Sequence, residues 1–105
     1  MCWKLIRDRL ADELRARGVP VWRIEDPEEL RAALVAKLFE EAYELAKARG
    51  REALEEAADL LEALLALLRL EGFGLEELLA ARDAKRRERG GFDAGYAAQV
   101  GCGEA

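Results

Sequence analysis

Apolar residues recur with helical spacing along most of this chain, and short segments rich in glycine or proline separate the helical stretches. The first helix is expected within residues 1–18, after a short opening segment. Ile6, Leu10 and Leu14 are four residues apart, which places them on one helical face, and Gly18 suits the position just after a helix end. The pattern therefore predicts a helix that stops before Gly18.

Residues 19–24 interrupt the helical pattern. Apolar and β-branched residues close to Pro20 predict an extended connector or a short edge strand, because proline cannot donate a hydrogen bond within a sheet. We interpret Trp22 as a packing residue that covers the bundle, in preference to a platform on which a base stacks.

A second helix has a clear start at Asp26. Asp26 can cap the first turn, Pro27 suits the first helical position, and Glu29 completes an arrangement similar to a capping box. We expect this helix to run to about Arg49 and to be ended by Gly50.

Glu41 falls on the apolar stripe of this second helix. The stripe consists of four leucines: Leu30, Leu34, Leu38 and Leu45. An ionised carboxylate on a stripe that faces the core is costly unless it is paired with a cation or bound to a metal. Lys37 could pair with Glu41, and Lys47 could pair with Glu44, so ordinary salt bridges remain an alternative here.

The third helical stretch carries acids without a local cation. No basic residue lies between Arg51 and Arg69, whereas five acids do: Glu52, Glu55, Glu56, Asp59 and Glu62. Like charges three or four residues apart destabilise a helix by roughly a few tenths of a kcal/mol per pair, and the helix dipole favours acids only in the first turn. This pattern favours a cation site over a solvated acidic face.

Two acidic pairs are placed symmetrically about Gly50. Glu44 lies six residues before this glycine and Glu56 six after it, while Glu41 lies nine before and Asp59 nine after. In an antiparallel helix pair, residues equidistant from the turn lie at similar heights, and packed axes are about 8–10 Å apart. The four carboxylates are therefore expected to converge on one small volume, where they would repel each other unless a cation held them.

The leucines of residues 60–68 spread over more than one helical face, which predicts a contact between protomers in addition to an internal core. A last helix is expected from Leu75 to about Arg89, before Gly90 and Gly91. Residues 93–105 are interpreted as a cover or subunit contact with a frayed end.

Two basic clusters stand out in an otherwise acidic chain. Lys4, Arg7 and Arg9 lie near its beginning, where composition alone favours solvated charges and the alternative is that one or two of them reach an anionic ligand. The second cluster closes the last expected helix: Arg82, Lys85, Arg86, Arg87 and Arg89. Cations in a last turn are favoured by the helix dipole, but this cluster also suits an anion such as a polyphosphate.

Composition limits the classes of function. The 105 residues, 51% hydrophobic and 37% charged, are expected to form a single all-α domain spanning residues 1–105. There is no histidine, which removes the usual proton shuttle and any Ser-His or Cys-His nucleophile. A net charge of −5 argues against nucleic-acid polymers and anionic membranes as partners. Cys2 and Cys102 have no ligand or redox spacing, and no signal peptide or membrane-length apolar run is present, so a cytoplasmic protein with reduced thiols is expected.

Four blocks, in order along nearly the whole chain, resemble the MazG-like all-α nucleoside triphosphate pyrophosphohydrolases. They are Lys4-Leu5-Ile6-Arg7-Asp8, Glu40-Glu41-x-x-Glu44, Glu56-x-x-Asp59 and Lys85-x-x-x-Arg89-Gly90-Gly91-Phe92. The first and last are similar to the opening and closing motifs of the small single-domain members called phosphoribosyl-ATP pyrophosphohydrolase-like. The resemblance is specific for the superfamily and not for a substrate. It implies a helical bundle with an antiparallel acidic helix pair, a dimer or tetramer, and cleavage of a nucleoside triphosphate to the monophosphate and pyrophosphate with Mg²⁺ or Mn²⁺.

The resemblance also assigns roles to residues. The implied metal ligands are the paired acids: Glu41, Glu44, Glu56 and Asp59. Glu40, beside Glu41, would orient or deprotonate the attacking water, since without histidine a carboxylate must take its proton. The implied phosphate ligands are the cations of the outer blocks: Lys4, Arg7, Lys85 and Arg89. The chain has no Walker motif, so a P-loop enzyme is excluded.

Two other classes of protein could use the same residues. A carboxylate-bridged di-iron bundle also gathers helical acids, but it normally uses Glu-x-x-His pairs, and this chain has no histidine. A non-catalytic helical interaction module would use the leucine-rich helix as its binding face and the acids only for solubility. Such a module would not be stabilised by Mg²⁺, whereas a cation that binds only the folded state raises the melting temperature.

Overall fold

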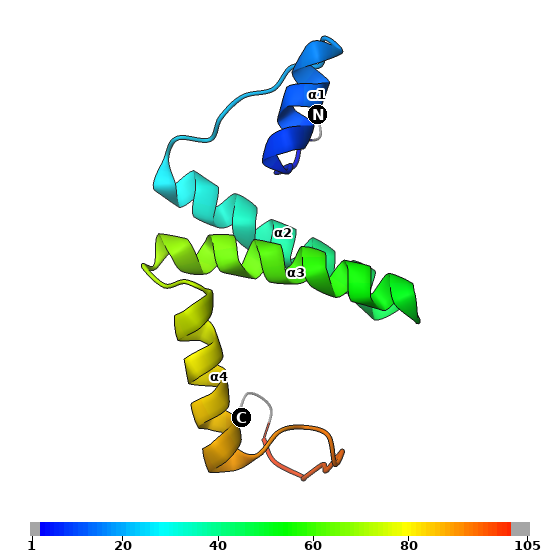
Figure 1. Ribbon diagram of the computed structural model, residues 1–105, viewed down its shortest axis with the longest axis vertical. Helices are drawn as coiled ribbons and strands as arrows, with labels where there is room; N and C mark the ends of the chain where they lie inside the picture. Colours follow the sequence, from blue (N-terminus) through cyan, green and yellow to red (C-terminus); the bar gives the residue numbers. More distant parts are fainter. Residues whose placement is uncertain (1–2, 102–105) are drawn as a thin grey trace. The chain divides into compact units, whose positions relative to one another are not determined.

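The computed structural model describes residues 3–101, and its secondary structure over that range consists of four α-helices without a strand. The helices are α1 (Asp8–Ala16), α2 (Pro27–Lys47), α3 (Arg51–Leu70) and α4 (Leu75–Arg89) (Figure 1). The all-α prediction is therefore confirmed, and residues 19–24 form the extended connector, not the edge strand. Cys2, Cys102 and the last residues of the expected frayed end lie outside the described residues.

The chain divides into two compact units, Met1–Gly74 and Leu75–Ala105. The first contains α1, α2 and α3, and the second contains α4 and the residues after it.

Helix α1 ends as the sequence predicts. Gly18 adopts a positive φ of 81°, a conformation that costs glycine little because it has no Cβ. The amide of Val19 then donates to the carbonyl of Leu14 at 2.9 Å, and that of Gly18 to the carbonyl of Arg15 at 3.0 Å. These two bonds close the helix in the manner of a Schellman motif.

Helix α2 begins at the predicted residue but ends earlier than expected. The Asp26 side chain accepts a hydrogen bond from the amide of Glu29 at 3.2 Å, and Pro27 occupies the first turn. The helix stops at Lys47, because Ala48 takes an extended conformation and is buried, and the Arg49 guanidinium donates to the Ala48 carbonyl at 3.0 Å. The prediction that Gly50 ends α2 is wrong.

Gly50 is instead the N-cap residue of α3, directly before Arg51. It adopts φ 59° and ψ −136°, a combination that a residue with a Cβ rarely adopts. The short connection lets α2 and α3 pack side by side in antiparallel directions (Figure 1). α3 ends at Leu70, with Glu71 at its cap and Gly72 at a positive φ.

The core of the first unit is small and lies along the α2–α3 contact. Its buried apolar residues are few and mostly small: Ala33, Leu34, Ala48, Ala63 and Leu65. Several larger apolar side chains of α2 and α3 remain exposed: Phe39, Tyr43, Leu54, Leu61 and Leu70. The helix pair therefore leaves much of its apolar surface uncovered within one chain.

The second unit is a helix followed by an irregular segment. Arg86 on α4 pairs with Asp93 at 3.0 Å, and this contact folds the segment after Gly90 back toward the helix end. A Cβ at Gly91 would lie only 2.2 Å from the Arg86 guanidinium, so a side chain there would displace it. Phe92 and Tyr96 are almost fully exposed, at 99% and 96%. Tyr96 therefore does not cover its own chain, and the alternative for residues 93–105, a subunit contact, stays a prediction.

Candidate functional site

Three of the four predicted metal ligands form one cluster. Carboxylate oxygens of Glu41 on α2 and of Glu56 and Asp59 on α3 all lie within 4.8 Å of one another. Their convergence follows from the antiparallel pairing, since Glu41 and Asp59 are equidistant from Gly50 and Glu56 is one turn from Asp59. We call these three residues the acidic cluster.

Glu41 is the buried member of the acidic cluster, with only 8% of its surface exposed. It lies on the apolar stripe of α2, as the sequence predicts, and Leu34 two turns earlier is buried as well. Lys37 lies 3.4 Å from its Oε1 atom, so the salt bridge that the sequence offers as the alternative to a metal is present here. One cation therefore compensates the carboxylate of α2 that is least accessible to water.

Glu56 is the member whose charge is least compensated. It makes no ion pair within residues 3–101, and partial desolvation raises its pKa above the ordinary value. The negative charges of Asp59, Glu41, Glu44 and Glu52 raise this pKa further. Because the ionised form is disfavoured here, an added cation would gain more at this position than at a solvated glutamate.

Glu44 lies outside the acidic cluster. It pairs with Lys47 at 3.5 Å, as predicted, and the same ammonium lies 4.5 Å from the centre of the Tyr43 ring. Glu44 is three residues from Glu41, which turns it about 60° around the helix. Its charge still contributes to the raised pKa of Glu56, so it remains close to the cluster.

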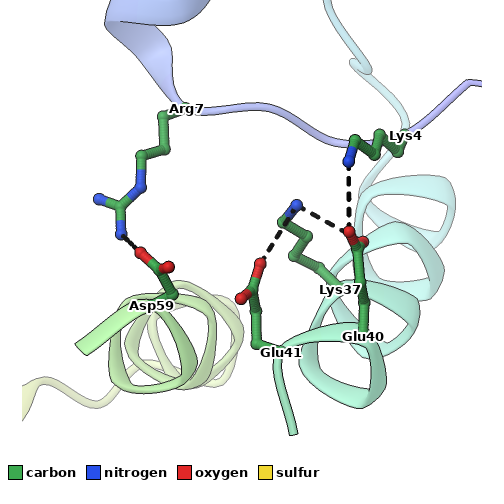
Figure 2. Close-up of polar contacts among 6 residues, drawn as sticks. All are labelled: Lys4, Arg7, Lys37, Glu40, Glu41 and Asp59. Atoms are coloured by element: carbon green, nitrogen blue, oxygen red, sulfur yellow. Dashed lines mark hydrogen bonds and ion pairs between the residues drawn. The ribbon is translucent and has the colours of Figure 1, made fainter. Parts of the chain in front are cut away.

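Two cations from the opening segment of the chain, Lys4 and Arg7, contact acidic side chains of α2 and α3 (Figure 2). Arg7 donates to Oδ1 of Asp59 at 2.5 Å, and the Lys4 ammonium lies 3.3 Å from Oε1 of Glu40. The sequence offers no basic residue between Arg51 and Arg69, yet two acids of α3 have cation partners: Asp59 pairs with Arg7, and Glu55 pairs with Arg51 at 3.5 Å. Arg7 is 52 residues away from Asp59 in sequence, so spacing along the helix could not reveal it.

Glu40 has the opposite environment to Glu56. Partial burial acts to raise its pKa, but the hydrogen bond from Lys4 and the charges of Lys37 and Lys4 outweigh that effect, and the net pKa is lowered. Figure 2 shows the Lys37 nitrogen between Glu40 and Glu41, 3.5 Å and 3.4 Å from their oxygens. Glu40 is therefore held as a carboxylate beside the acidic cluster and outside it.

An open groove of about 610 Å³ adjoins the acidic cluster. Glu41 and Asp59 line it together with Arg7 and Lys37, and Leu34 and Ala63 contribute apolar surface. Both cations thus lie where an anion bound next to the carboxylates would reach them. Concave sites of this size, apolar with a few charged groups, are typical of small-molecule binding.

The remaining predicted phosphate ligands, Lys85 and Arg89, lie on α4 in the second unit. They occupy the last two turns of that helix, with Arg86 and Arg87 between them. Their role in phosphate binding stays a prediction.

The donor set of the cluster suits a hard divalent cation. Its donors are carboxylate oxygens, which Mg²⁺, Mn²⁺ and Ca²⁺ prefer, and no histidine exists in the chain to favour zinc or a di-iron centre. Mg²⁺ typically uses one or two protein carboxylates and completes its shell with water and phosphate oxygens. The three converging carboxylates beside an open groove offer oxygen ligands of this kind.

Comparison of the chain with protein-family models, curated proteins and solved structures finds no match. Within residues 3–101, none of the helices combines the length and apolar character needed to cross a membrane.

Proposed function

We propose that this protein hydrolyses a nucleoside triphosphate, or a related nucleotide, to the monophosphate and pyrophosphate with Mg²⁺, for which Mn²⁺ can substitute. The observation that carries the proposal is the convergence of Glu41, Glu56 and Asp59 next to a groove lined by Arg7 and Lys37. The sequence resemblance to MazG-like pyrophosphohydrolases supports the same reaction.

In this proposal the acidic cluster holds the divalent cation, and Glu44 joins it through an intervening water or a change of rotamer. A bound Mg²⁺ would neutralise phosphate charge and lower the pKa of water. Glu56 gains most from the cation, because its raised pKa records an environment rich in negative charge. Arg7 and Lys37, which now pair with Asp59 and Glu41, would be shared with or transferred to the phosphates.

Glu40 is the proposed base for the attacking water. Hydrolysis adds the water oxygen to a phosphorus of the α–β linkage, breaks the bond from that phosphorus to the bridging oxygen, and releases a proton. The Lys4 and Lys37 cations keep Glu40 ionised, and in the proposed reaction it would give up one of these contacts to orient the water and accept that proton. Glu41, buried against Lys37, is the alternative acceptor.

A substrate panel tests the reaction. The protein is incubated with NTPs, dNTPs and phosphoribosyl-ATP, with Mg²⁺ or with Mn²⁺, and pyrophosphate is measured. Release from at least one nucleotide, abolished by EDTA, is expected. Absence of pyrophosphate with every member under both metals would contradict the proposal.

Self-association is a second part of the proposal, and it is supported by the small core. Five apolar residues are buried in the described chain, while Leu54, Leu61 and Phe39 of the helix pair are exposed. Burying apolar area in a dimer or tetramer would supply stability that so short a chain lacks. Replacing Leu61 by Glu should convert the oligomer to monomer in light scattering, whereas a monomeric parent protein would contradict this part.

A further inference from the structure

A second groove, distinct from the one beside the acidic cluster, runs along α2 and has an aromatic wall. Its volume is about 470 Å³. We call it the aromatic groove and define it by six of its lining residues: Trp3, Trp22, Ile24, Ala32, Ala36 and Lys37. It lies entirely within the first unit.

The floor and walls of the aromatic groove suit a flat ring. Ala32 and Ala36 are one turn apart on α2 and exposed, so the helix presents a surface without long side chains there. Trp3 and Trp22 contact each other edge to face with ring centres 5.8 Å apart, yet 55% and 53% of their surfaces remain exposed. Indole faces that are fixed by a partner and left open are the groups on which nucleobases stack.

The charged end of this groove connects it to the acidic cluster. Lys37 lines both grooves, and its ammonium contacts Glu40 on one side and Glu41 on the other. Lys4 also lines the aromatic groove and pairs with Glu40. Glu40, which both lysines contact, lines the same groove, and so does Glu29. The groove is therefore aromatic and apolar along much of its wall, with paired charges of both signs where it approaches the acidic cluster.

We propose that the aromatic groove is the subsite for the nucleobase of the nucleotide, with the base against Trp3 and Trp22 and the phosphates directed past Lys37 toward the acidic cluster. A nucleotide has an aromatic ring at one end and anionic phosphates at the other. The ring would stack on the indoles, and the phosphates would replace Glu40 as partners of the Lys4 and Lys37 ammonium groups. This inference rests on the proposed function for the direction of the phosphates. It changes the interpretation of Trp22 from a packing residue to a binding residue that is held by Trp3.

Tryptophan fluorescence tests the subsite without catalysis, because the chain has only these two tryptophans. The intact protein in EDTA is titrated with each of the four ribonucleoside 5′-monophosphates, and with ribose 5-phosphate as the ligand without a base. At least one nucleotide should quench the fluorescence with saturation, and ribose 5-phosphate should not. Trp22→Ala should weaken that binding about tenfold, the scale of one base–aromatic stacking contact, with Trp3 remaining as the reporter.

A filled groove gives a second variant that does not remove an aromatic packing partner. Ala36→Leu places a larger side chain on the floor at an exposed helical position, and Ala46→Leu makes the same change on α2 outside the groove. Ala36→Leu should weaken nucleotide binding about tenfold or more, and Ala46→Leu should leave it unchanged, with helix content equal in both.

Three results would overturn the subsite: no quenching by any nucleotide, equal quenching by ribose 5-phosphate, or Trp22→Ala and Ala36→Leu variants that change only the oligomeric state. The last result would mean that a second copy of the chain covers these rings. Pyrophosphate release without base-dependent quenching would reject the subsite and leave the proposed function intact. Base-dependent quenching without pyrophosphate release would reject the proposed function and leave the subsite intact.

Discussion

Glu40 and Glu56 lie on the two facing helices of one antiparallel pair, and their pKa values move in opposite directions. On the α2 side, Lys4 and Lys37 outweigh the effect of burial and lower the pKa of Glu40. On the α3 side, desolvation and neighbouring carboxylates raise the pKa of Glu56. The cations of this unit are thus distributed unevenly, and the uncompensated negative charge is concentrated at α3. That difference identifies the position at which a divalent cation would be most effective.

The largest expected effect comes from neutralising the uncompensated side. Glu56→Gln removes the negative charge of one carboxylate from the acidic cluster. It should lower the rate of pyrophosphate release at least about a hundredfold, because replacing even a residue that only hydrogen-bonds to a metal ligand commonly lowers metal affinity or activity about tenfold to a hundredfold. Glu55→Gln is the matched control, because Glu55 lies on the same helix and pairs with Arg51. Equal activity of the two variants in a steady-state assay would contradict a metal role for Glu56.

An intermediate effect is expected from Arg7, which compensates Asp59 on the same side. Arg7→Gln frees that carboxylate and should tighten Mg²⁺ binding in the absence of substrate about twofold to fivefold, the range that corresponds to one exposed ion pair. Calorimetric titration measures the change. Arg17→Gln changes the net charge equally at an exposed position and should leave the affinity unaltered. Weaker binding by Arg7→Gln would indicate that Arg7 supports the cation site instead of competing with it.

The smallest effects are those on the stability of the metal-free protein, and their signs should differ between the two sides. Glu40 has a lowered pKa in the folded protein. Its ionised form therefore stabilises the fold at pH values above the pKa of this carboxyl in the unfolded chain, and the stabilisation is lost as the pH falls through the folded-state pKa. Glu40→Gln should therefore destabilise at neutral pH by roughly a few tenths of a kcal/mol, as for other partly exposed ion pairs.

Glu56 has a raised pKa, so its ionised form is penalised at neutral pH and the penalty disappears as the pH falls through the carboxyl range. Glu56→Gln should raise the melting temperature at neutral pH, and the gain should vanish in acid. Thermal unfolding of both variants across the pH range in EDTA checks the pair. Shifts of the same sign would remove the contrast between the two sides.

Local signals predicted the helices well. The cap at Asp26, the proline after it and the glycine at residue 18 act within one turn, so their effect can be predicted without knowing the fold. The end of α2 could not be predicted, because it accompanies the burial of Ala48, which arises only in the folded chain.

The candidate site was predictable as far as symmetry about Gly50 determines it. Equal distances from the turn brought Glu41 and Asp59 together, with Glu56 beside them. Glu44 lies outside the cluster and pairs with Lys47, although it is as far from Gly50 as Glu56 is. Arg7 reaches Asp59 across 52 residues, and such a contact follows from the path of the opening segment and not from any helical period.

Thermal unfolding of the intact protein with increasing Mg²⁺ tests the cation site most directly, with the parent protein, Glu56→Gln and Glu55→Gln measured in parallel. We expect the melting temperature of the parent and of Glu55→Gln to rise with Mg²⁺, because a cation that binds only the folded state stabilises it, and we expect no rise for Glu56→Gln. A parent protein whose melting temperature does not respond to Mg²⁺ or Mn²⁺, or a Glu56→Gln variant that responds equally, would contradict a divalent cation at the acidic cluster.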